Sequence, residues 1–354
     1  MKRLDRYLMA TVLGGALLAL AIIIALLLVF EYMEEFDDIG RGNYTALGAL
    51  TYVLLKLPHR LYQGYPMAAL IGSLMGLGAL AANSELTAMR AAGMSVARIA
   101  RAVVAAGLLL GLGALAIGEW LAPPAERMAQ ELRSIAIHDR VTVRDRGFWA
   151  RDGDLFIEVR RAVSQEQLAG LRIFQLGEDG RPLRILTAES AHHADGAWVL
   201  TEPVMTEFGD DGVRVERLPR WSWSGTLEPR LLEAVVVDPD TLPIRDLLGY
   251  IGYLRRNGLE TEHYRLALWS KVATPLATVA MLLLTVPLVF GGVRSSGAGQ
   301  RIFLGVLIGF AFILLNRLLI RVGLVYGLPP ALSALLPTLL VLSGGIYGIV
   351  RLRR

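Results

Sequence analysis

Residues 8–30 read LMATVLGGALLALAIIIALLLVF and contain no charged side chain. A helix of about 20 apolar residues is long enough to cross the roughly 30 Å hydrocarbon core of a bilayer. The run exceeds the roughly 7–15 residues of a secretory signal core, and acidic residues follow it instead of a small-residue cleavage site. We therefore predict a retained membrane span.

The same pattern recurs along the chain. Five further apolar runs cover residues 65–82, 99–121, 264–290, 302–322 and 331–350. Of the 354 residues, 54% are hydrophobic and only 19% are charged, which is far from the composition of a soluble domain. The sequence predicts six transmembrane helices.

Basic residues alternate between the connections and so predict the orientation. Residues 1–6, the 83–101 and 291–301 connections, and the tail 351–354 are all basic. Because positively charged connections stay in the cytoplasm, we expect both termini and residues 83–101 there. The acidic segment 31–38 then lies outside.

The connection between the third and fourth spans changes character abruptly. Alternating stretches such as DLFIEVRRAV and LRIFQLG are separated by RDGD and GEDGRP, which is the pattern of short antiparallel strands joined by turns. Helices are expected at 125–137 and 244–256. We predict membrane helices one to three in residues 1–122, an all-β domain with flanking helices in 123–262, and helices four to six in 263–354.

Motifs of enzymes are missing from the sequence. None of the three lysines follows a glycine, so no phosphate-binding loop of that type exists, and cysteine is absent. His192 and His193 are neighbours in a strand, where side chains point to opposite faces, so they are poorly placed to share a metal. We expect a transporter subunit with no catalytic residue, no metal or cofactor of its own, and no nucleic-acid partner. What His138 and these two histidines contact is left open.

The segment 83–95, NSELTAMRAAGMS, predicts a short amphipathic helix on the cytoplasmic side. Asn83 or Ser84 would cap its start, with Glu85 in the first turn, where the helix dipole favours an anion. Gly93 suits its end, and Ser95 can cap the next helix.

Two interpretations of this helix remain open. It could rest on lipid, with the acid serving only the helix dipole. Alternatively it could dock into a cleft of a cytoplasmic protein through its acid and its apolar edge. The residues expected to take part are Glu85, Leu86, Met89 and Arg90.

The chain resembles the permeases of lipopolysaccharide-export ABC transporters. The resemblance is carried by SELTAMRAAGMS, by AIGEWLAPPAE at 116–126, by GFWARDGDLFI at 147–157, and by LWSKVATPLAT and VYGLPPALSALLPT. It extends over nearly the whole chain, and GEWLAP is closer to the G-type than to the F-type subunit.

The resemblance implies several partners. They are an F-type permease paralogue, a cytoplasmic ATPase dimer that binds ATP and Mg²⁺, and a membrane-anchored periplasmic jellyroll protein. It further implies that the β domain is a periplasmic jellyroll, that lipopolysaccharide is extracted from the outer leaflet of the inner membrane, and that the acid at position 85 pairs with an arginine of the ATPase.

Basic residues also gather at the expected outer ends of the spans, where the positive-inside rule disfavours them. Because a buried base costs roughly 2.5–3.5 kcal/mol at the bilayer centre, these residues call for an explanation. They could extend to the headgroups, with Glu119 as a counter-ion, or ring a cavity and bind phosphates of a lipid head. The candidates are Lys271, Arg133, Arg317, Arg321, Arg60, Arg127 and Lys56.

Two features depart from the family pattern. The segment EYMEEFDDIGRG, residues 31–42, is acidic where G-type subunits carry lysines, and His59 stands where a lysine is common. The acidic patch could repel the head group, bind a bridging cation, or pair with a basic patch on a partner.

Two other functions compete with this interpretation. A self-contained secondary transporter or flippase would need acids inside the membrane, and only Glu119 comes close. A scaffold whose β domain organises an envelope complex is the third possibility.

Overall fold

The computed structural model describes residues 3–138, 147–164, 166–177, 181–194, 196–209, 212–223, 238–291 and 297–352. The chain divides into two compact units. The first, which we call the membrane unit, contains Met1–Glu34, Val53–Glu126 and Arg265–Arg354. The second, the β unit, contains Glu35–Tyr52 and Arg127–Tyr264, a grouping that the sequence did not lead us to expect.

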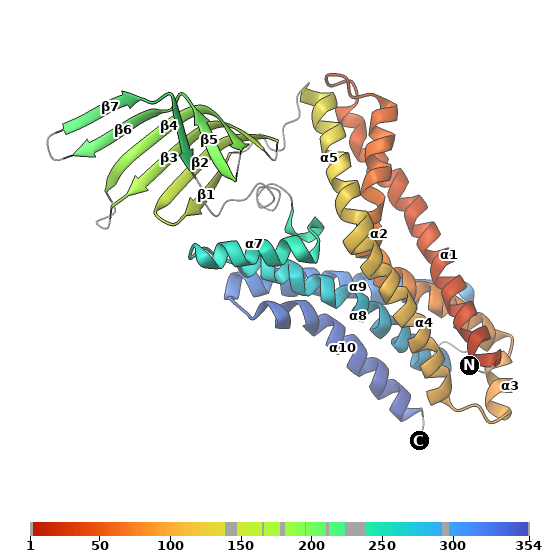
Figure 1. The fold of residues 1–354 in the computed structure, drawn as a ribbon. Coiled ribbons are helices and arrows are strands. Elements are labelled where there is room, and N and C mark those ends of the chain that lie inside the picture. The colour runs from red at the N-terminus through yellow and green to blue at the C-terminus, as the bar shows by residue number, and fades with distance from the viewer. Residues whose placement is uncertain are drawn as a thin grey trace. The chain divides into compact units, whose positions relative to one another are not determined.

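Long helices build the membrane unit (Figure 1). They are α1 (Arg3–Glu34), α2 (Ala46–Ala82), α4 (Val96–Ala116), α8 (Glu262–Phe290), α9 (Ala298–Tyr326) and α10 (Pro330–Arg351), with the short α3 (Glu85–Ala91) between α2 and α4. Within the described residues, six helical segments are long and apolar enough to cross a membrane, which confirms the prediction.

Helix α2 is the one whose extent the sequence misjudged. It begins at Ala46, well before the apolar run that starts at residue 65. Pro58 and Pro66 lie inside it, and Lys56 and Arg60 are therefore helical residues and not part of a preceding loop. A hydropathy average does not detect this first part of α2, because it counts the charged side chains together with the apolar ones on the other faces of the helix.

Helices α2, α4 and α8 form the centre of the membrane unit. In the most apolar stretch of each helix, 67% of the residues are buried in α2, against 22% in α1 and 11% in α9. The buried side of α1 is a stripe at helical spacing that includes Leu8, Val12 and Ala16, each fully buried. Helices α1 and α9 therefore lie at the periphery of this single chain.

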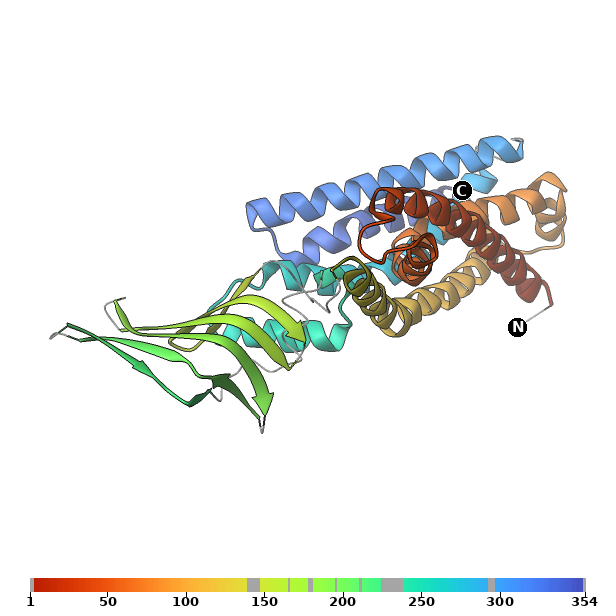
Figure 2. The same cartoon turned by 90° about the horizontal axis from the view of Figure 1, so that it is seen from above.

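The β unit is built on antiparallel strands (Figures 1 and 2). The strands are β1 (Phe148–Asp152), β2 (Leu155–Ser164), β3 (Gln167–Leu176), β4 (Pro182–Ala194), β5 (Ala197–Thr201), β6 (Val204–Gly209), β7 (Gly212–Arg217) and β8 (Arg220–Trp223). The described strands form one sheet in the order β1-β2-β3-β4-β5-β8, with β6 paired to β4 and β7 to β6. The predicted antiparallel all-β class is confirmed, whereas the jellyroll arrangement stays a prediction.

The two ends of this strand order meet. The indole Nε1 of Trp223 in β8 donates to Oδ2 of Asp152 at the end of β1, 2.7 Å away. Because β1 and β8 end the path β1-β2-β3-β4-β5-β8, this bond requires the sheet to curl on itself. Trp198 and Ile157 are fully or almost fully buried in this unit.

Both predicted flanking helices are present. Helix α5 (Ala122–His138) follows α4 through a π turn, η2 (Ile117–Leu121), and α7 (Ile244–Arg256) follows a short 3₁₀ turn, η3 (Pro239–Thr241). The phenol of Tyr253 in α7 donates to the Arg151 carbonyl oxygen at 2.7 Å, which joins α7 to β1. Burial raises the pKa of Tyr253 to about 12, because it disfavours the phenolate.

Candidate functional site

Helix α3 starts differently from the expectation. Ser84 has a φ of 61° and its side chain makes no capping hydrogen bond, so the predicted cap is wrong. Only Asn83 and Ser84 separate α2 from α3, and so short a reversal requires a residue in the left-handed region. Ser84 takes that conformation and cannot also hold the extended one that a capping side chain needs.

The end of α3 agrees with the sequence. Gly93 has a φ of +86°, its N–H donates to the Arg90 carbonyl at 2.9 Å, and the N–H of Met94 donates to the Met89 carbonyl at 3.0 Å. This pair of bonds is the Schellman ending that a glycine permits. The Ser95 hydroxyl accepts from the N–H of Arg98 at 3.3 Å and caps α4 as predicted.

The apolar edge of α3 faces inward. Leu86 and Met89 are 2% and 8% exposed and belong to the same buried cluster as Leu8 of α1 and Val289 of α8. Leu86 and Met89 are therefore covered by this chain and not presented to a partner's cleft, whereas docking of the helix through Glu85 and Arg90 stays a prediction. The covered edge seats α3 firmly on the ends of α1 and α8.

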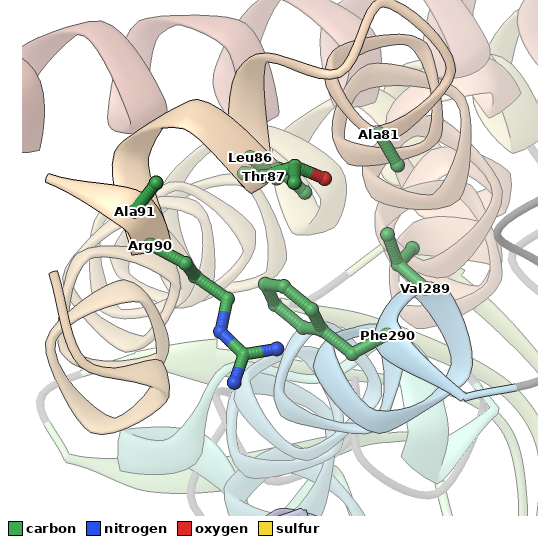
Figure 3. A pocket seen from close by; sticks show the side chains of 7 residues that line it. All are labelled: Ala81, Leu86, Thr87, Arg90, Ala91, Val289 and Phe290. Carbon is green, nitrogen blue, oxygen red and sulfur yellow. The ribbon is translucent and has the colours of Figure 1, made fainter. Parts of the chain in front are cut away.

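A groove opens between α3 and the end of α8 (Figure 3). Its volume is about 310 Å³, and its lining residues are Ala81, Leu86, Thr87, Arg90, Ala91, Val289 and Phe290. The Arg90 guanidinium lies 5.7 Å from the centre of the Phe290 ring, within the range of a cation–π contact. The groove thus offers an apolar floor beside an exposed cation and the exposed Thr87 hydroxyl.

Glu85 begins α3 and is partly exposed. The phenol of Tyr7 in α1 donates to its Oε2 at 2.8 Å. Among the described residues, no donor reaches Oε1. Glu85 directly precedes Leu86, a lining residue of the groove.

Lys271 lies inside the membrane unit and not at its surface. It is 3% exposed, and its Nζ donates to Oε1 of Glu119 at 2.9 Å and to the Gly118 carbonyl at 3.0 Å. The same Nζ lies 5.9 Å from the centre of the Tyr62 ring. This geometry matches the counter-ion alternative, and Lys271 is not free to contact a lipid head in this structure.

Lys56 and Arg60 share one carboxylate. Lys56 Nζ is 3.3 Å from Oε2 of Glu31, and Arg60 Nε is 2.6 Å from Oε1 of the same side chain. Glu31 is 9% exposed, so its charge is compensated by these two bases and not by water.

The β unit holds two of the remaining four predicted bases. Arg127 pairs with Asp246 at 3.2 Å. Arg133 pairs with Glu35 at 3.2 Å and with Asp38, both in the acidic segment. The sequence left open whether that segment repels the head group, binds a bridging cation, or pairs with a basic patch on a partner, and in the structure Arg133 of this same chain pairs with it.

Tyr44 belongs to the same cluster as Arg133. Its hydroxyl donates to Oε2 of Glu35 at 3.0 Å. Burial and the neighbouring carboxylate both raise the pKa of Tyr44, since each disfavours the phenolate.

Arg317 and Arg321 differ from the rest. Both are exposed on α9, one helical turn apart, and neither forms an ion pair within the described part of the chain. Of the predicted cations these two are open to an anion from outside. The other five bases each pair with a carboxylate of this chain, and only Glu119 was offered as such a partner by the sequence. The ring of cations around a cavity stays a prediction.

The histidines give no sign of a metal site. The rings of His193 and Trp198 meet edge to face at 5.2 Å, and His59 Nε2 lies 2.9 Å from Nε2 of Gln63. No group of three or more His, Cys, Asp or Glu side chains is placed to hold a metal among the residues that the structure describes.

Comparisons with known proteins agree on one family. Residues 6–352 match the family model described as lipopolysaccharide export system permease LptF/LptG. The chain is 34% identical over 339 residues to the lipopolysaccharide export system permease protein LptG of Escherichia coli K12, covering 95% of this chain and 94% of that protein. It is 32% identical over 340 residues to the protein of the same name in Haemophilus influenzae, covering 95% of both. A match of this extent and identity means that the chain belongs to the LptF/LptG family of lipopolysaccharide export permeases.

Proposed function

We propose that this chain is the G-type permease subunit of an ABC transporter for lipopolysaccharide in the bacterial inner membrane. Its relatives carry that role in their names, and the six apolar helices suit a multi-pass membrane protein. Both termini and α3 would lie in the cytoplasm and the β unit in the periplasm. The chain would pair with an F-type permease, and lipid would pass from the membrane to a periplasmic jellyroll partner.

The observation that carries the coupling part of the proposal is the seat of α3. This short helix is anchored by Leu86 and Met89 in the core and presents Thr87, Arg90 and a carboxylate oxygen of Glu85 at the surface beside a groove. Because Leu86 and Met89 hold α3 in the core, a partner that binds the polar face of α3 can move this helix without detaching it from the rest of the chain. We expect an arginine of the cytoplasmic ATPase to donate a charge-assisted hydrogen bond to Oε1 of Glu85.

Arg317 and Arg321 are the favoured contacts for the lipid phosphates. Their guanidinium groups are exposed and have no ion pair within the described residues. A base that is already neutralised by a carboxylate gains less from a phosphate, because it must first give up its partner. Lys271, Arg133, Arg127, Arg60 and Lys56 all have such partners.

Two acids of the membrane unit bear on the rival secondary transporter. Its ion site would be an acid inside the membrane with access to ions. Glu119 is held by Lys271 at 2.9 Å, and Glu31 by Lys56 and Arg60. The charges of these two carboxylates are therefore already compensated by bases of this chain.

Co-purification and lipid crosslinking test the proposal. Glu85→Ala should leave the protein folded but reduce the amount of ATPase that co-purifies with it, since a charge-assisted bond is lost. The combination Arg317→Glu and Arg321→Glu should reduce crosslinking to lipopolysaccharide by about tenfold or more, because it replaces two attractive charges by two repulsive ones.

Arg255→Glu with Arg256→Glu provides a matched control for the second test, because both residues are exposed bases at the end of α7. This control should crosslink as the wild-type protein does. Equal crosslinking of the α9 double variant would show that these arginines do not bind the lipid. Undiminished ATPase binding by the Glu85 variant would remove α3 as the docking element.

A further inference from the structure

Tyr7 and Asp5, both in the first two turns of α1, bind one residue at the start of α3 and one residue that follows α3 in the chain. Tyr7 donates to Oε2 of Glu85, the first residue of α3, at 2.8 Å. Asp5 accepts two bonds from Arg98 in the first turn of α4, from Nε at 3.0 Å and from Nη2 at 3.2 Å. The second contact is a bidentate pair, which fixes orientation as well as distance.

These polar contacts differ from the packing beneath them. Leu86 and Met89 bury α3 against α1, α4 and α8 together, so they hold it in place without favouring one helix. A hydrogen bond is directional, and Tyr7 and Asp5 both belong to α1. The Tyr7 bond ties α3 to α1, and the Asp5 bonds tie the start of α4 to α1.

Helix α1 is less buried in this chain than α8 is. In the most apolar stretch of each helix, 22% of the residues are buried in α1 and 56% in α8. The apolar buried stripe of α1 ends at Leu20, close approaches to α2 lie at Thr11 and Gly15, and Glu31 near the outer end pairs with α2. A displacement at the base of α1 therefore moves less buried surface than a displacement of α8.

We propose that Tyr7 and Asp5 are positioning residues that couple α3 to the first membrane span. Tyr7 binds Oε2 of Glu85 and so ties the start of α3 to α1, and Asp5 clamps the start of α4, so movement imposed on α3 is carried to α1. This inference rests on the proposed docking of α3. It adds the route by which the movement leaves α3.

The contact of Arg90 with Phe290 is the competing route, since it would lead to α8 instead. Helix α8 is held by a more extensive buried surface, from Leu266 to Val289. Movement of α8 would have to carry that surface along. The bonds of Tyr7 and Asp5 lead to α1, which has the smaller buried share, and for this reason we favour them.

The test uses the complete transporter with its ATPase, reconstituted in lipid, and measures lipopolysaccharide released per ATP hydrolysed. Tyr7→Phe combined with Asp5→Asn should lower this ratio by about tenfold, the scale of losing charge-assisted bonds. The ATPase rate and the amount of co-purified ATPase should stay close to wild type. The melting temperature should stay within about 2 °C of wild type, because the hydrogen bonds of Tyr7 and Asp5 are partly exposed.

Control variants separate the possible outcomes. Tyr347→Phe changes an exposed tyrosine on α10 and should leave the ratio unchanged. Asp5→Arg with Arg98→Asp should recover part of the loss of Asp5→Asn, because the pair is restored in reverse. An unchanged ratio in the double variant, or a loss produced by Phe290→Leu alone, would overturn the route through α1. Loss of ATPase binding in the double variant would also overturn it, since the residues would then act in docking.

The failure of the wider proposal looks different. If the wild-type chain binds no ATPase or releases no lipid on ATP hydrolysis, the transporter function itself is wrong. If the wild-type transporter couples ATP hydrolysis to lipid release and the Tyr7 and Asp5 variants couple equally well, the proposed function stands and the route through α1 is wrong.

Discussion

Lys271 shows what a single residue contributes to this membrane unit. Its ammonium bonds to Glu119 and to the Gly118 carbonyl, and its own carbonyl accepts from the Tyr62 hydroxyl at 3.2 Å. Glycine at 118 is required because a Cβ there would lie 2.7 Å from the Tyr62 ring. The π turn Ile117–Leu121, the start of α8 and the middle of α2 are joined at this one point.

Breaking this ion pair on one side should destabilise the protein. Lys271→Met would remove the base that compensates the largely buried charge of Glu119, at a cost of about 3–5 kcal/mol. We expect a clearly lower melting temperature in detergent and a smaller monodisperse fraction on size-exclusion chromatography.

The double variant distinguishes stabilisation from lipid binding. Lys271→Met with Glu119→Leu removes both charges and should recover most of the stability, because an apolar pair has no desolvation cost. Lipid crosslinking of this variant should equal that of wild type. Reduced crosslinking in a fully stable double variant would mean that Lys271 takes part in lipid binding.

The sequence showed that Lys271 lies in a membrane span, but not whether its ammonium group is paired inside the protein or contacts lipid. The partner Glu119 lies 152 positions away along the chain, and only folding brings the two together. The sequence did offer Glu119 as a counter-ion, since it was the one acid near the membrane in that region. It could not decide between a buried pair and a lipid contact, because both use the same residue types.

At the scale of elements, the crossing of α1 and α2 depends on glycine. A Cβ on Gly15 would lie 2.2 Å from the Gly72 carbonyl oxygen, and one on Gly72 would lie 2.4 Å from the Cα of Ala16. A Cβ on Gly76 would lie 2.8 Å from the Thr11 carbonyl oxygen. Small residues four apart let two membrane helices approach closely, which is the main source of their attraction in lipid.

Gly14 and Gly15 offer a direct test of this crossing. Gly15→Ala should destabilise the protein by about 1–3 kcal/mol, since two backbones must separate to admit a methyl group. Gly14→Ala meets nothing within 4 Å and should be neutral or slightly stabilising, because alanine favours the helix. Thermal unfolding of the two variants side by side measures the difference. Equal melting temperatures would mean that α1 and α2 cross with more space than this structure gives them.

Elements differ in how well their sequence predicts them. The spans and the helix at 244–256 follow from composition and periodicity, and Gly93 marks the end of α3 because few other residues adopt its φ. The start of α3 did not follow, since the two-residue link to α2 overrides the capping preference of Ser84. Nor did the burial of Leu86 and Met89, because an amphipathic pattern does not say what covers the apolar side.

At the scale of the whole molecule, the chain does not divide in sequence order. Residues Glu35–Tyr52 group with the β unit although they follow α1 and include the first turns of α2. Asp38 and Arg133 are 95 positions apart, and the Asn43 N–H donates to the Ala136 carbonyl at 2.7 Å. Local patterns predict local structure, and a contact over that separation is visible only after folding.

This grouping predicts that residues 35–52 and helix α5 open together. Gly42 has a φ of +56°, and a Cβ there would lie 2.6 Å from the Ala136 carbonyl oxygen. Gly42→Ala should therefore accelerate amide hydrogen exchange in both segments by about tenfold or more, as expected for a local destabilisation of 1–3 kcal/mol. Exchange in α8 should not change. Hydrogen-exchange mass spectrometry of the detergent-solubilised protein makes the measurement.

Gly40→Ala is the matched control, because it shares the positive φ of Gly42, at +94°, but its Cβ would meet nothing within 4 Å. It should carry the backbone strain alone and accelerate exchange only near residue 40. If both variants open only the loop and leave α5 protected, the segment is a loosely attached connection. If Gly42→Ala alone opens α5, the contact with Ala136 is what makes residues 35–52 part of the β unit, because strain without a clash stays local.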